Sequence, residues 1–215
     1  IRTPVGALMG HCQVALYQPR TVEEYETLLA NNMEELERIS RMVENILFLA
    51  RASDARSVLT ITAIDVSTEM TRIQDYFEGL AEEREMTLDS KGAGVLYADA
   101  ILFQRALSNL VANAVRYGRA GSAIVLRAEP HPRGMDIHVI SQGHPIPADK
   151  LGKLFDRFYR ADASRSEGGS SSGLGLSIVQ AIMALHQGHV TVESSAQGET
   201  RFTLSFPAAD HTFSQ

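Results

Sequence analysis

A regularly spaced apolar seam between residues 29 and 50 limits how this chain can fold more than any other feature of its sequence. The seam positions follow one another at alternating steps of three and four residues: Leu29, Asn32, Leu36, Ile39, Val43, Ile46 and Ala50. This alternation is the heptad pattern of helices that pack lengthwise against one another. Thr21 and Glu24 form a capping-box pair just after Pro19, so we expect the long helix to begin near residue 21.

A shorter helix should precede this one, because apolar residues recur at helical spacing before Pro19: Val5, Leu8, Cys12 and Ala15. Two such helices with a short turn form an antiparallel hairpin. Further apolar residues widen the face of the second helix beyond what one hairpin covers: Leu28, Met33, Met42 and Leu47. We therefore expect a homodimer through the segment 1–53, in which two hairpins make a four-helix bundle. Asn32 either sets the register of the seam or lies at its solvated end.

The pattern changes near residue 58 to short strands alternating with helices. Apolar runs predict strands at 58–66, 86–89, 94–97, 123–128, 135–140, 190–194 and 201–206. Helices are expected after a cap at Ser67 or Thr68, from Asp99 to Tyr117, at 148–158 and at 174–186. These elements predict an α+β chain with two domains. A helical hairpin at 1–57 is followed at 58–215 by an α/β sandwich, with helices on one face of a mixed sheet.

Bulk properties exclude several classes of function. The 215 residues carry a net charge of −6 without a compensating basic stripe, which argues against nucleic-acid binding. No run of about 18 apolar residues is present, so we expect no membrane contact by this segment. Cys12 is the only cysteine, which excludes an intramolecular disulfide and a thiolate zinc site.

Two local features favour phosphate and metal chemistry. A Gly- and Ser-rich stretch at 168–175 stands directly before an expected helix, where N–H groups and the helix dipole attract phosphate. A flexible linker would have a similar composition. Asn109 and Asn113 are four residues apart and project from one helical face. Their amide oxygens suit a hydrated Mg²⁺ whose charge is balanced by nucleotide phosphates, and the alternative is that they bond neighbouring loops.

Five motifs occur in an order that resembles the sensor histidine kinases. NLVANA at 109–114 resembles their asparagine box, LFDRFYR at 154–160 their phenylalanine box, and SGLGLSIV at 172–179 their second glycine box. GETRF at 198–202 is similar to their last conserved strand, and IRTP at 1–4 to the end of their histidine box. Together the motifs span nearly the whole chain.

The hairpin sequence RMVENILFLAR at 41–51 is similar to the heavy-metal subgroup of these sensors, the copper and silver type. The resemblance implies an ATP-binding domain of the histidine kinase, gyrase and chaperone superfamily, with ATP and Mg²⁺ as cofactors. It implies autophosphorylation of a histidine, phosphotransfer to an aspartate of a response regulator, and phosphatase activity. The chain would then be the cytoplasmic portion of a bacterial inner-membrane protein.

The resemblance assigns roles to residues of the asparagine box. Asn113 would give an amide oxygen to Mg²⁺, with Asn109 beside it in the catalytic set. Arg116 would reach the phosphates, and Tyr117 would pack on the adenine side.

Further roles fall on the later motifs. Gly173, Leu174 and Gly175 would bring the backbone of a lid at 161–173 to the phosphates. Arg160 would add a cation at the base of this lid, unless it forms only a surface ion pair. Thr200 would lie near the adenine.

The first glycine box departs from the family pattern. The family has an aspartate that accepts a hydrogen bond from the adenine amino group, and Ser141 stands at that position. Gly143 keeps the first glycine, and Pro145 replaces the second. Because hydrogen bonds to charged groups are stronger than neutral ones, we expect ATP binding about tenfold weaker than with an aspartate.

The histidine box is the second departure. The phosphorylated histidine of the family would lie two positions before Ile1, so we expect this segment not to phosphorylate itself. His11 matches no family position and is expected at the surface or on the dimer seam. Thr3 falls where related kinases orient the water that hydrolyses the phosphorylated regulator, which implies a phosphatase role.

Two rival functions remain open on the sequence. A degenerate ATP domain that dimerises and binds a regulator without kinase activity would also explain Ser141 and Pro145. A hydrolytic ATPase of the gyrase and chaperone type would need a glutamate base where Asn109 stands, which disfavours it.

Overall fold

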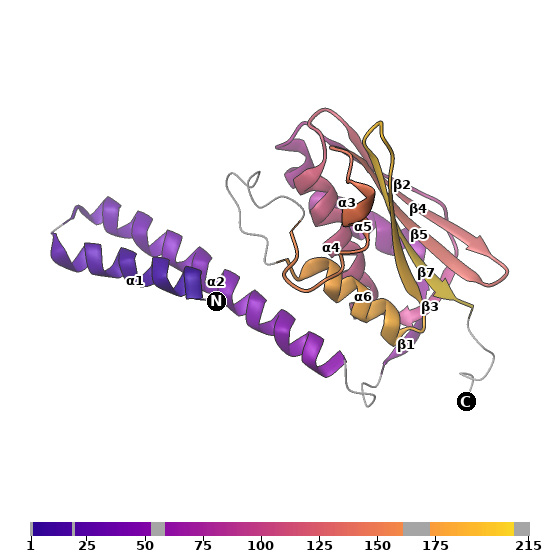
Figure 1. The fold of residues 1–215 in the computed structure, drawn as a ribbon, viewed down its shortest axis with the longest axis horizontal. Helices are drawn as coiled ribbons and strands as arrows, with labels where there is room; N and C mark the ends of the chain where they lie inside the picture. The colour runs from indigo at the N-terminus through magenta and orange to yellow at the C-terminus, as the bar shows by residue number, and fades with distance from the viewer. Residues whose placement is uncertain (1, 19, 53–58, 161–172, 209–215) are drawn as a thin grey trace. The chain divides into compact units, whose positions relative to one another are not determined.

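The computed structural model describes residues 2–18, 20–52, 59–160 and 173–208, and of residues 2–4 only the backbone (Figure 1). The chain divides into two compact units, residues 1–50 and 51–215, and each is described by itself. The predicted domain boundary at 57/58 lies outside the described residues.

The first unit is a hairpin of two helices, α1 (Arg2–Tyr17) and α2 (Val22–Ala52) (Figure 1). The predicted capping box is confirmed at the start of α2. The Thr21 N–H donates to Glu24 Oε2 at 2.9 Å, and the Glu24 N–H donates to Thr21 Oγ1 at 3.2 Å. These bonds satisfy N–H groups that a helix start otherwise leaves without acceptors.

Asn32 is buried between the two helices of this hairpin. Its Oδ1 lies 3.3 Å from Nδ1 of His11, and its Nδ2 donates to Sγ of Cys12 at 3.7 Å. A solvated seam end is therefore the wrong interpretation for a single chain, because the amide is held by α1. The amide joins α2 to α1 through these two contacts, and a role in setting the register stays a prediction.

The second unit is built on a mixed five-stranded sheet of order β2-β4-β5-β7-β6. Its strands are β2 (Thr87–Lys91), β4 (Ala123–His131), β5 (Gly134–Gln142), β6 (His189–Ser194) and β7 (Glu199–Pro207). The pairing of β2 with β4 is parallel and the other pairings are antiparallel. A parallel pair needs a crossover, and the chain between β2 and β4 provides it.

Three helices cover one face of this sheet: α3 (Val66–Glu82), α4 (Ala100–Tyr117) and α6 (Gly175–Leu185) (Figure 1). The layer between helices and sheet holds fully buried side chains that include Phe103, Leu107, Leu110, Ile124, Leu126, Ile137, Ile178, Ile182 and Leu204. Each such side chain stabilises the fold by about 1.5–3 kcal/mol through burial. The predicted α/β sandwich with helices on one face is confirmed.

A separate two-stranded antiparallel sheet joins β1 (Ile61–Asp65) to β3 (Val95–Asp99). Asp99 ends β3 and caps α4, as predicted, by accepting from the N–H groups of Ile101 and Leu102 at 3.1 Å each. The predicted cap of α3 at Ser67 or Thr68 is wrong. Asp65 is the cap, because its carboxylate accepts from the Thr68 N–H at 3.0 Å and from the Ser67 hydroxyl at 2.6 Å.

The helix predicted at 148–158 is also wrong in its length. Only α5 (Ala148–Leu151) is helical, and turns follow it. Gly152 is a poor helix residue, and Phe158 adopts a left-handed φ of 65°, which a helix cannot contain.

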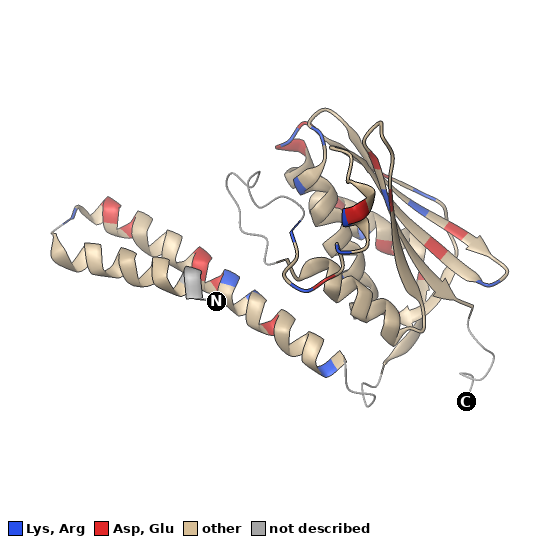
Figure 2. Ribbon diagram, in the orientation of Figure 1, with Lys and Arg blue, Asp and Glu red and all other residues tan. Residues whose placement is uncertain are grey.

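Charged side chains of both signs are interspersed over the described residues (Figure 2). No helix among those residues has the length and apolar character needed to cross a bilayer.

Candidate nucleotide-binding site

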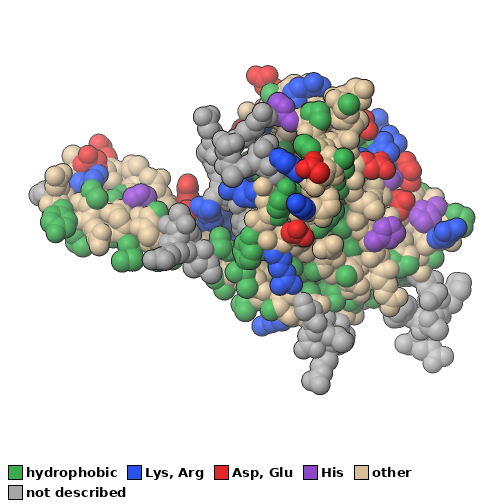
Figure 3. Space-filling model, in the orientation of Figure 1, with side chains coloured by type: hydrophobic (Ala, Val, Ile, Leu, Met, Phe, Trp, Pro, Cys, Tyr) green, Lys and Arg blue, Asp and Glu red, His purple; other side chains and the backbone are tan. Residues whose placement is uncertain are grey.

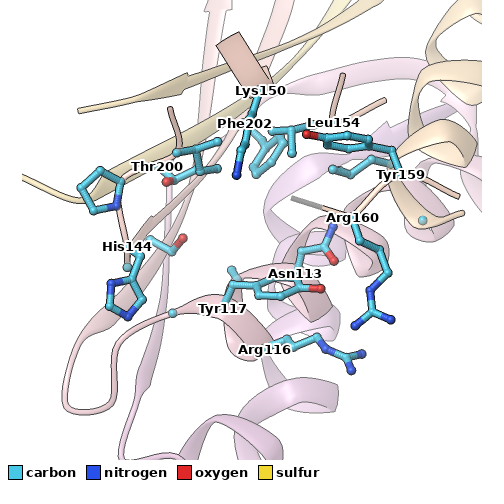
Figure 4. Close-up of a pocket in the computed structure, with 18 of the residues that line it drawn as sticks. Asn113, Arg116, Tyr117, His144, Lys150, Leu154, Tyr159, Arg160, Thr200 and Phe202 are labelled. Carbon is cyan, nitrogen blue, oxygen red and sulfur yellow. The ribbon is translucent and has the colours of Figure 1, made fainter. Parts of the chain in front are cut away.

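A cavity of ≈ 380 Å³ opens in the second unit between the end of α4, the ends of β5 and β7, α5 and the start of α6 (Figure 4). This volume is within the usual range for small-molecule sites. Its lining is polar at one end, with amide, guanidinium and glycine groups. The other end is mainly apolar and contains hydroxyl groups.

Helix α4 supplies the floor of the polar end. Asn109, Asn113 and Arg116 follow one another at steps of four and three residues, so they share a face. Asn113 and Arg116 line the cavity together with Tyr117. The Arg116 guanidinium carbon lies 5.8 Å from the centre of the Tyr117 ring, which holds the two side chains side by side.

Two glycines bring the start of α6 to this floor. Gly173 has a φ of +67°, and its backbone lies so close to Phe158 that a Cβ would stand 2.8 Å from the carbonyl carbon of Phe158. A Cβ on Gly175 would stand 3.0 Å from Oδ1 of Asn109. The helix N-cap is Leu174, whose side chain makes no capping bond. The start of α6 reaches the cavity at Gly175, and the N–H groups and dipole of a helix start attract anions.

Cations line both ends of the cavity. Arg84, Arg116 and Arg160 contribute to the polar end and Lys150 to the opposite end, and no described lining residue is Asp or Glu. Figure 4 shows the guanidinium groups of Arg116 and Arg160 on the same side of the cavity, beyond Asn113. The Arg84 guanidinium donates to the Arg116 carbonyl at 2.9 Å, which ties it to the end of α4. The cavity is therefore electrostatically suited to a polyanion.

The opposite end is formed by the sheet and α5. Ser141 on β5 and Thr200 on β7 stand directly opposite each other in the antiparallel pair, and both are buried. Thr200 Oγ1 lies 3.3 Å from Ser194 Oγ, which accepts from the Ile146 N–H at 2.9 Å. Apolar groups complete this end: Pro145, Ile146, Leu154 and Phe202.

Gly143 of the predicted first glycine box lines the cavity and also allows close backbone packing. A Cβ on Gly143 would stand 2.8 Å from the Tyr117 carbonyl oxygen. The Gly143 N–H donates to the Gly198 carbonyl at 2.7 Å, and Gly143 also bridges to Gly118. Only a residue without a side chain lets the end of α4 approach β5 this closely.

Most of the predicted ATP-binding residues line this one cavity: Asn113, Arg116, Tyr117, Ser141, Gly143, Arg160, Gly173, Gly175 and Thr200. Two of the predicted residues do not. Asn109 lies beside Gly175, and its Nδ2 donates to the Arg105 carbonyl at 2.8 Å. The Leu174 side chain is buried in the core, 1% exposed, so only its backbone is available to a ligand.

Two further predictions lie outside the described residues. The side chain of Thr3, in α1, is one of them, and residues 161–172 of the lid predicted at 161–173 are the other.

Sequence reasoning missed several residues of the wall: Arg84, His144, Lys150, Tyr159 and Leu176. Tyr159 and Leu176 belong to the recognised boxes and were within reach of a position-by-position reading. Arg84 follows α3 and Lys150 lies on α5, and neither carried a local signal. Their place in the cavity depends on how distant segments pack.

The described lining offers Mg²⁺ a neutral oxygen, the amide oxygen of Asn113. Among the described residues no group of three or more His, Cys, Asp or Glu side chains could hold a metal ion. The Asn113 amide would suit a magnesium ion that takes further oxygen ligands from a nucleotide.

Comparisons with known proteins agree with this site. Residues 98–210 match the family described as histidine kinase-, DNA gyrase B- and HSP90-like ATPase, and residues 1–55 match the His kinase A phospho-acceptor domain. The chain is 43% identical over 96% of its length to the sensor protein CzcS of Cupriavidus metallidurans, covering 44% of that protein. It is 41% identical over 97% of its length to the sensor histidine kinase CusS of Escherichia coli, covering 43% of it.

The chain thus spans less than half the length of these relatives. The solved structure of the Acinetobacter baumannii histidine kinase AdeS shares the fold, with a TM-score of 0.81, 21% identity and 97% of each chain covered. The family and subgroup predicted from the motifs are confirmed. The chain belongs to the sensor histidine kinases, joins a phospho-acceptor domain to an ATPase domain, and has heavy-metal sensor kinases among its relatives.

Proposed function

We propose that this chain is the catalytic core of a two-component sensor kinase that binds Mg²⁺-ATP in the cavity of the second unit. The observation that carries the proposal is the meeting of Asn113, two arginines and the start of α6 at one end of a single cavity. Helix N-termini and arginines both favour phosphate.

The two ends of the cavity differ in chemistry, and this difference sets the orientation of the bound nucleotide. The triphosphate lies at the end with Arg116, Arg160, Gly173 and Gly175, because that end supplies positive charge and N–H donors. The base lies between Ser141, Thr200 and the apolar side chains, where an aromatic ring buries its faces and finds hydroxyl partners for its edge.

Asn113 is the residue proposed to hold Mg²⁺ through its amide oxygen. Held there, the ion would supply positive charge that offsets the negative charge developing on the transferred phosphoryl group. The chain's own groups then orient the terminal phosphate: Arg116 and Arg160 by charge, and the first N–H groups of α6 by hydrogen bonds.

We propose that the γ-phosphoryl group passes to a histidine nitrogen of the phospho-acceptor domain and then to an aspartate of a response regulator. In the phosphatase reaction, Thr3 would orient the water that hydrolyses the phosphorylated aspartate of the regulator. The protein of which this chain is a part would be anchored in a bacterial inner membrane, with these residues on the cytoplasmic side.

Dimerisation through 1–53 is proposed from the apolar face that α2 leaves uncovered. Leu29, Met33 and Leu36 are each more than half exposed, and Val43 and Leu47 are exposed as well. Figure 3 shows apolar side chains on the viewed face of the hairpin. A second hairpin would cover this face, and the resulting bundle is the surface on which the regulator docks.

A degenerate module that dimerises and binds a regulator is the second candidate. Ser141 and Pro145 favour it, because they remove the charged acceptor and one glycine of the first glycine box. It predicts no nucleotide affinity, so a binding measurement separates the two.

The test is a titration of the 215-residue chain with a fluorescent ATP analogue, with and without Mg²⁺. We expect saturable binding that Mg²⁺ strengthens, and a loss of about tenfold or more in Asn113→Ala. Asn31→Ala is the matched control, because Asn31 is exposed on α2 in the other unit and its loss should change nothing. Equal affinities of the two variants would remove Asn113 from the site, and the absence of binding would favour the degenerate module.

A further inference from the structure

The base end of the cavity offers hydroxyl groups in place of carboxylates. Ser141 and Thr200 face each other across β5 and β7 and line the cavity, while no lining residue in the described part of the chain is Asp or Glu. The polar edge of a base bound there would meet groups that can either donate or accept a hydrogen bond.

Thr200 belongs to a hydrogen-bonded chain whose direction is reversible. The Ile146 N–H donates to Ser194 Oγ at 2.9 Å, and Ser194 Oγ lies 3.3 Å from Thr200 Oγ1, where either atom can be the donor. When Ser194 donates to Thr200, the Thr200 hydrogen is available to a ligand. When Thr200 donates to Ser194, the Thr200 lone pairs can accept from a ligand. The change needs only two hydroxyl rotations and no movement of heavy atoms.

Purines differ at position 6 in the very property that this chain of hydroxyls can adjust. Adenine carries an amino group there, which donates, whereas hypoxanthine and guanine carry a carbonyl oxygen, which accepts. A carboxylate can only accept, so it favours the amino group and repels the carbonyl. Ser141 and Thr200 can serve both.

Lys150 adds to this effect. It lines the cavity from α5, and Figure 4 shows its side chain between Thr200 and Phe202. An ammonium group only donates, so it can bond a carbonyl oxygen at the base edge but not an amino group.

We infer that the cavity does not select between 6-amino and 6-oxo purine triphosphates and binds inosine or guanosine triphosphate about as well as ATP. The inference rests on the proposed nucleotide function and names its substrate class. Ser141 is the specificity-determining residue, because an acceptor-only side chain at that position would restore selection for adenine.

The test uses inosine triphosphate, which lacks the 2-amino group of guanosine triphosphate and differs from ATP only at position 6 and at N1, where an acceptor becomes an N–H donor. Dissociation constants of ATP and inosine triphosphate are measured on the 215-residue chain by displacement of trinitrophenyl-ATP. We expect the two constants to agree within about threefold, and Ser141→Asp to favour ATP by about tenfold or more. Ser205→Asp, which places the same charge on β7 at a residue outside the cavity wall, should leave the ratio unchanged.

Each outcome bears on the inference. A preference for ATP of tenfold or more in the unaltered chain overturns it. If Ser141→Asp still binds ATP and inosine triphosphate equally well, with an unchanged circular dichroism spectrum, Ser141 does not determine the nucleotide specificity. If Ser141→Asp does not fold, the ratio in the unaltered chain decides alone. If neither nucleotide displaces the probe, the proposed function itself fails.

Discussion

Oδ1 of Asn109 lies so close to Gly175 that a Cβ at position 175 would stand 3.0 Å from it. This contact joins the helix that carries Asn113 to the first turn of α6. Helices α4 and α6 can lie this close at the polar end of the cavity because Gly175 has no side chain where the Asn109 amide stands. Gly173 has a different constraint, because its left-handed φ and its contact with Phe158 are both in the backbone.

The two glycines should respond differently to alanine. Gly173→Ala should lower the free energy of unfolding by about 1–3 kcal/mol, because a left-handed φ and a backbone contact cannot be relieved by moving a side chain. Gly175→Ala should cost less than about 1 kcal/mol, because the Asn109 amide can move and alanine favours the helix. Urea unfolding measures both.

Gly152→Ala is the control for this pair, because a Cβ there meets no atom within 4 Å. Equal losses in Gly173→Ala and Gly175→Ala would contradict the distinction.

The buried amide of Asn32 gives a second prediction. Asn32→Ala should lower the free energy of unfolding of the hairpin by about 1 kcal/mol, since it removes the bonds to His11 and Cys12. Asn31→Ala, one residue away and exposed, should change it by less than about 0.5 kcal/mol. Thermal unfolding at fixed protein concentration compares them, and similar shifts for both would show that the amide contacts contribute nothing.

Ser141→Asp should raise the affinity for ATP by about tenfold, because a charged acceptor makes a stronger hydrogen bond to the adenine amino group than a hydroxyl does. The lining arginines and Lys150 would offset part of the cost of placing a carboxylate in the cavity. Calorimetric titration with ATP and Mg²⁺ measures the change. An unchanged or weaker affinity would show that the base edge does not meet residue 141.

His11 should not become phosphorylated. Its Nδ1 lies 3.3 Å from the Asn32 amide oxygen, although the residue itself is exposed, and it occupies no position of the histidine box. Incubation of the 215-residue chain with γ-labelled ATP and Mg²⁺ should leave the chain unlabelled. Acid-labile label on the chain that disappears in His11→Gln would refute this prediction.

The cap of α3 predicts a pH dependence of stability. Hydrogen bonds from the Ser67 hydroxyl and the Thr68 N–H hold the pKa of Asp65 below its ordinary value. A carboxyl group whose pKa is lowered by folding stabilises the folded state above its unfolded pKa, and this contribution is lost as the pH falls through the folded value.

Asp65→Asn keeps a capping side chain but removes the charge. It should therefore be less stable than the unaltered chain at pH 6, and the difference should shrink below about pH 4. Chemical unfolding at several pH values measures it. A difference that stays constant down to pH 3 would exclude the charge as its cause.

The elements predicted correctly were those fixed by neighbouring residues. The capping box at Thr21 and Glu24 and the cap at Asp99 use bonds that span two or three residues, so their pattern is visible in the sequence. The error at 148–158 concerns a segment in which helix ends at Leu151 and the backbone at Phe158 turns to a left-handed conformation. The cap of α3 was misplaced because Asp65 reads equally well as the last residue of a strand.

The sequence by itself determined the paired helices, the order of the motifs and a part of the cavity wall, because heptads, caps and motifs are short-range patterns. Only the tertiary structure decided that Ser141 stands opposite Thr200, that Lys150 reaches the same cavity, and that Leu174 turns into the core. Those contacts join segments tens of residues apart. They follow from strand pairing and from the packing of α4 and α6 on the sheet, which no local pattern encodes.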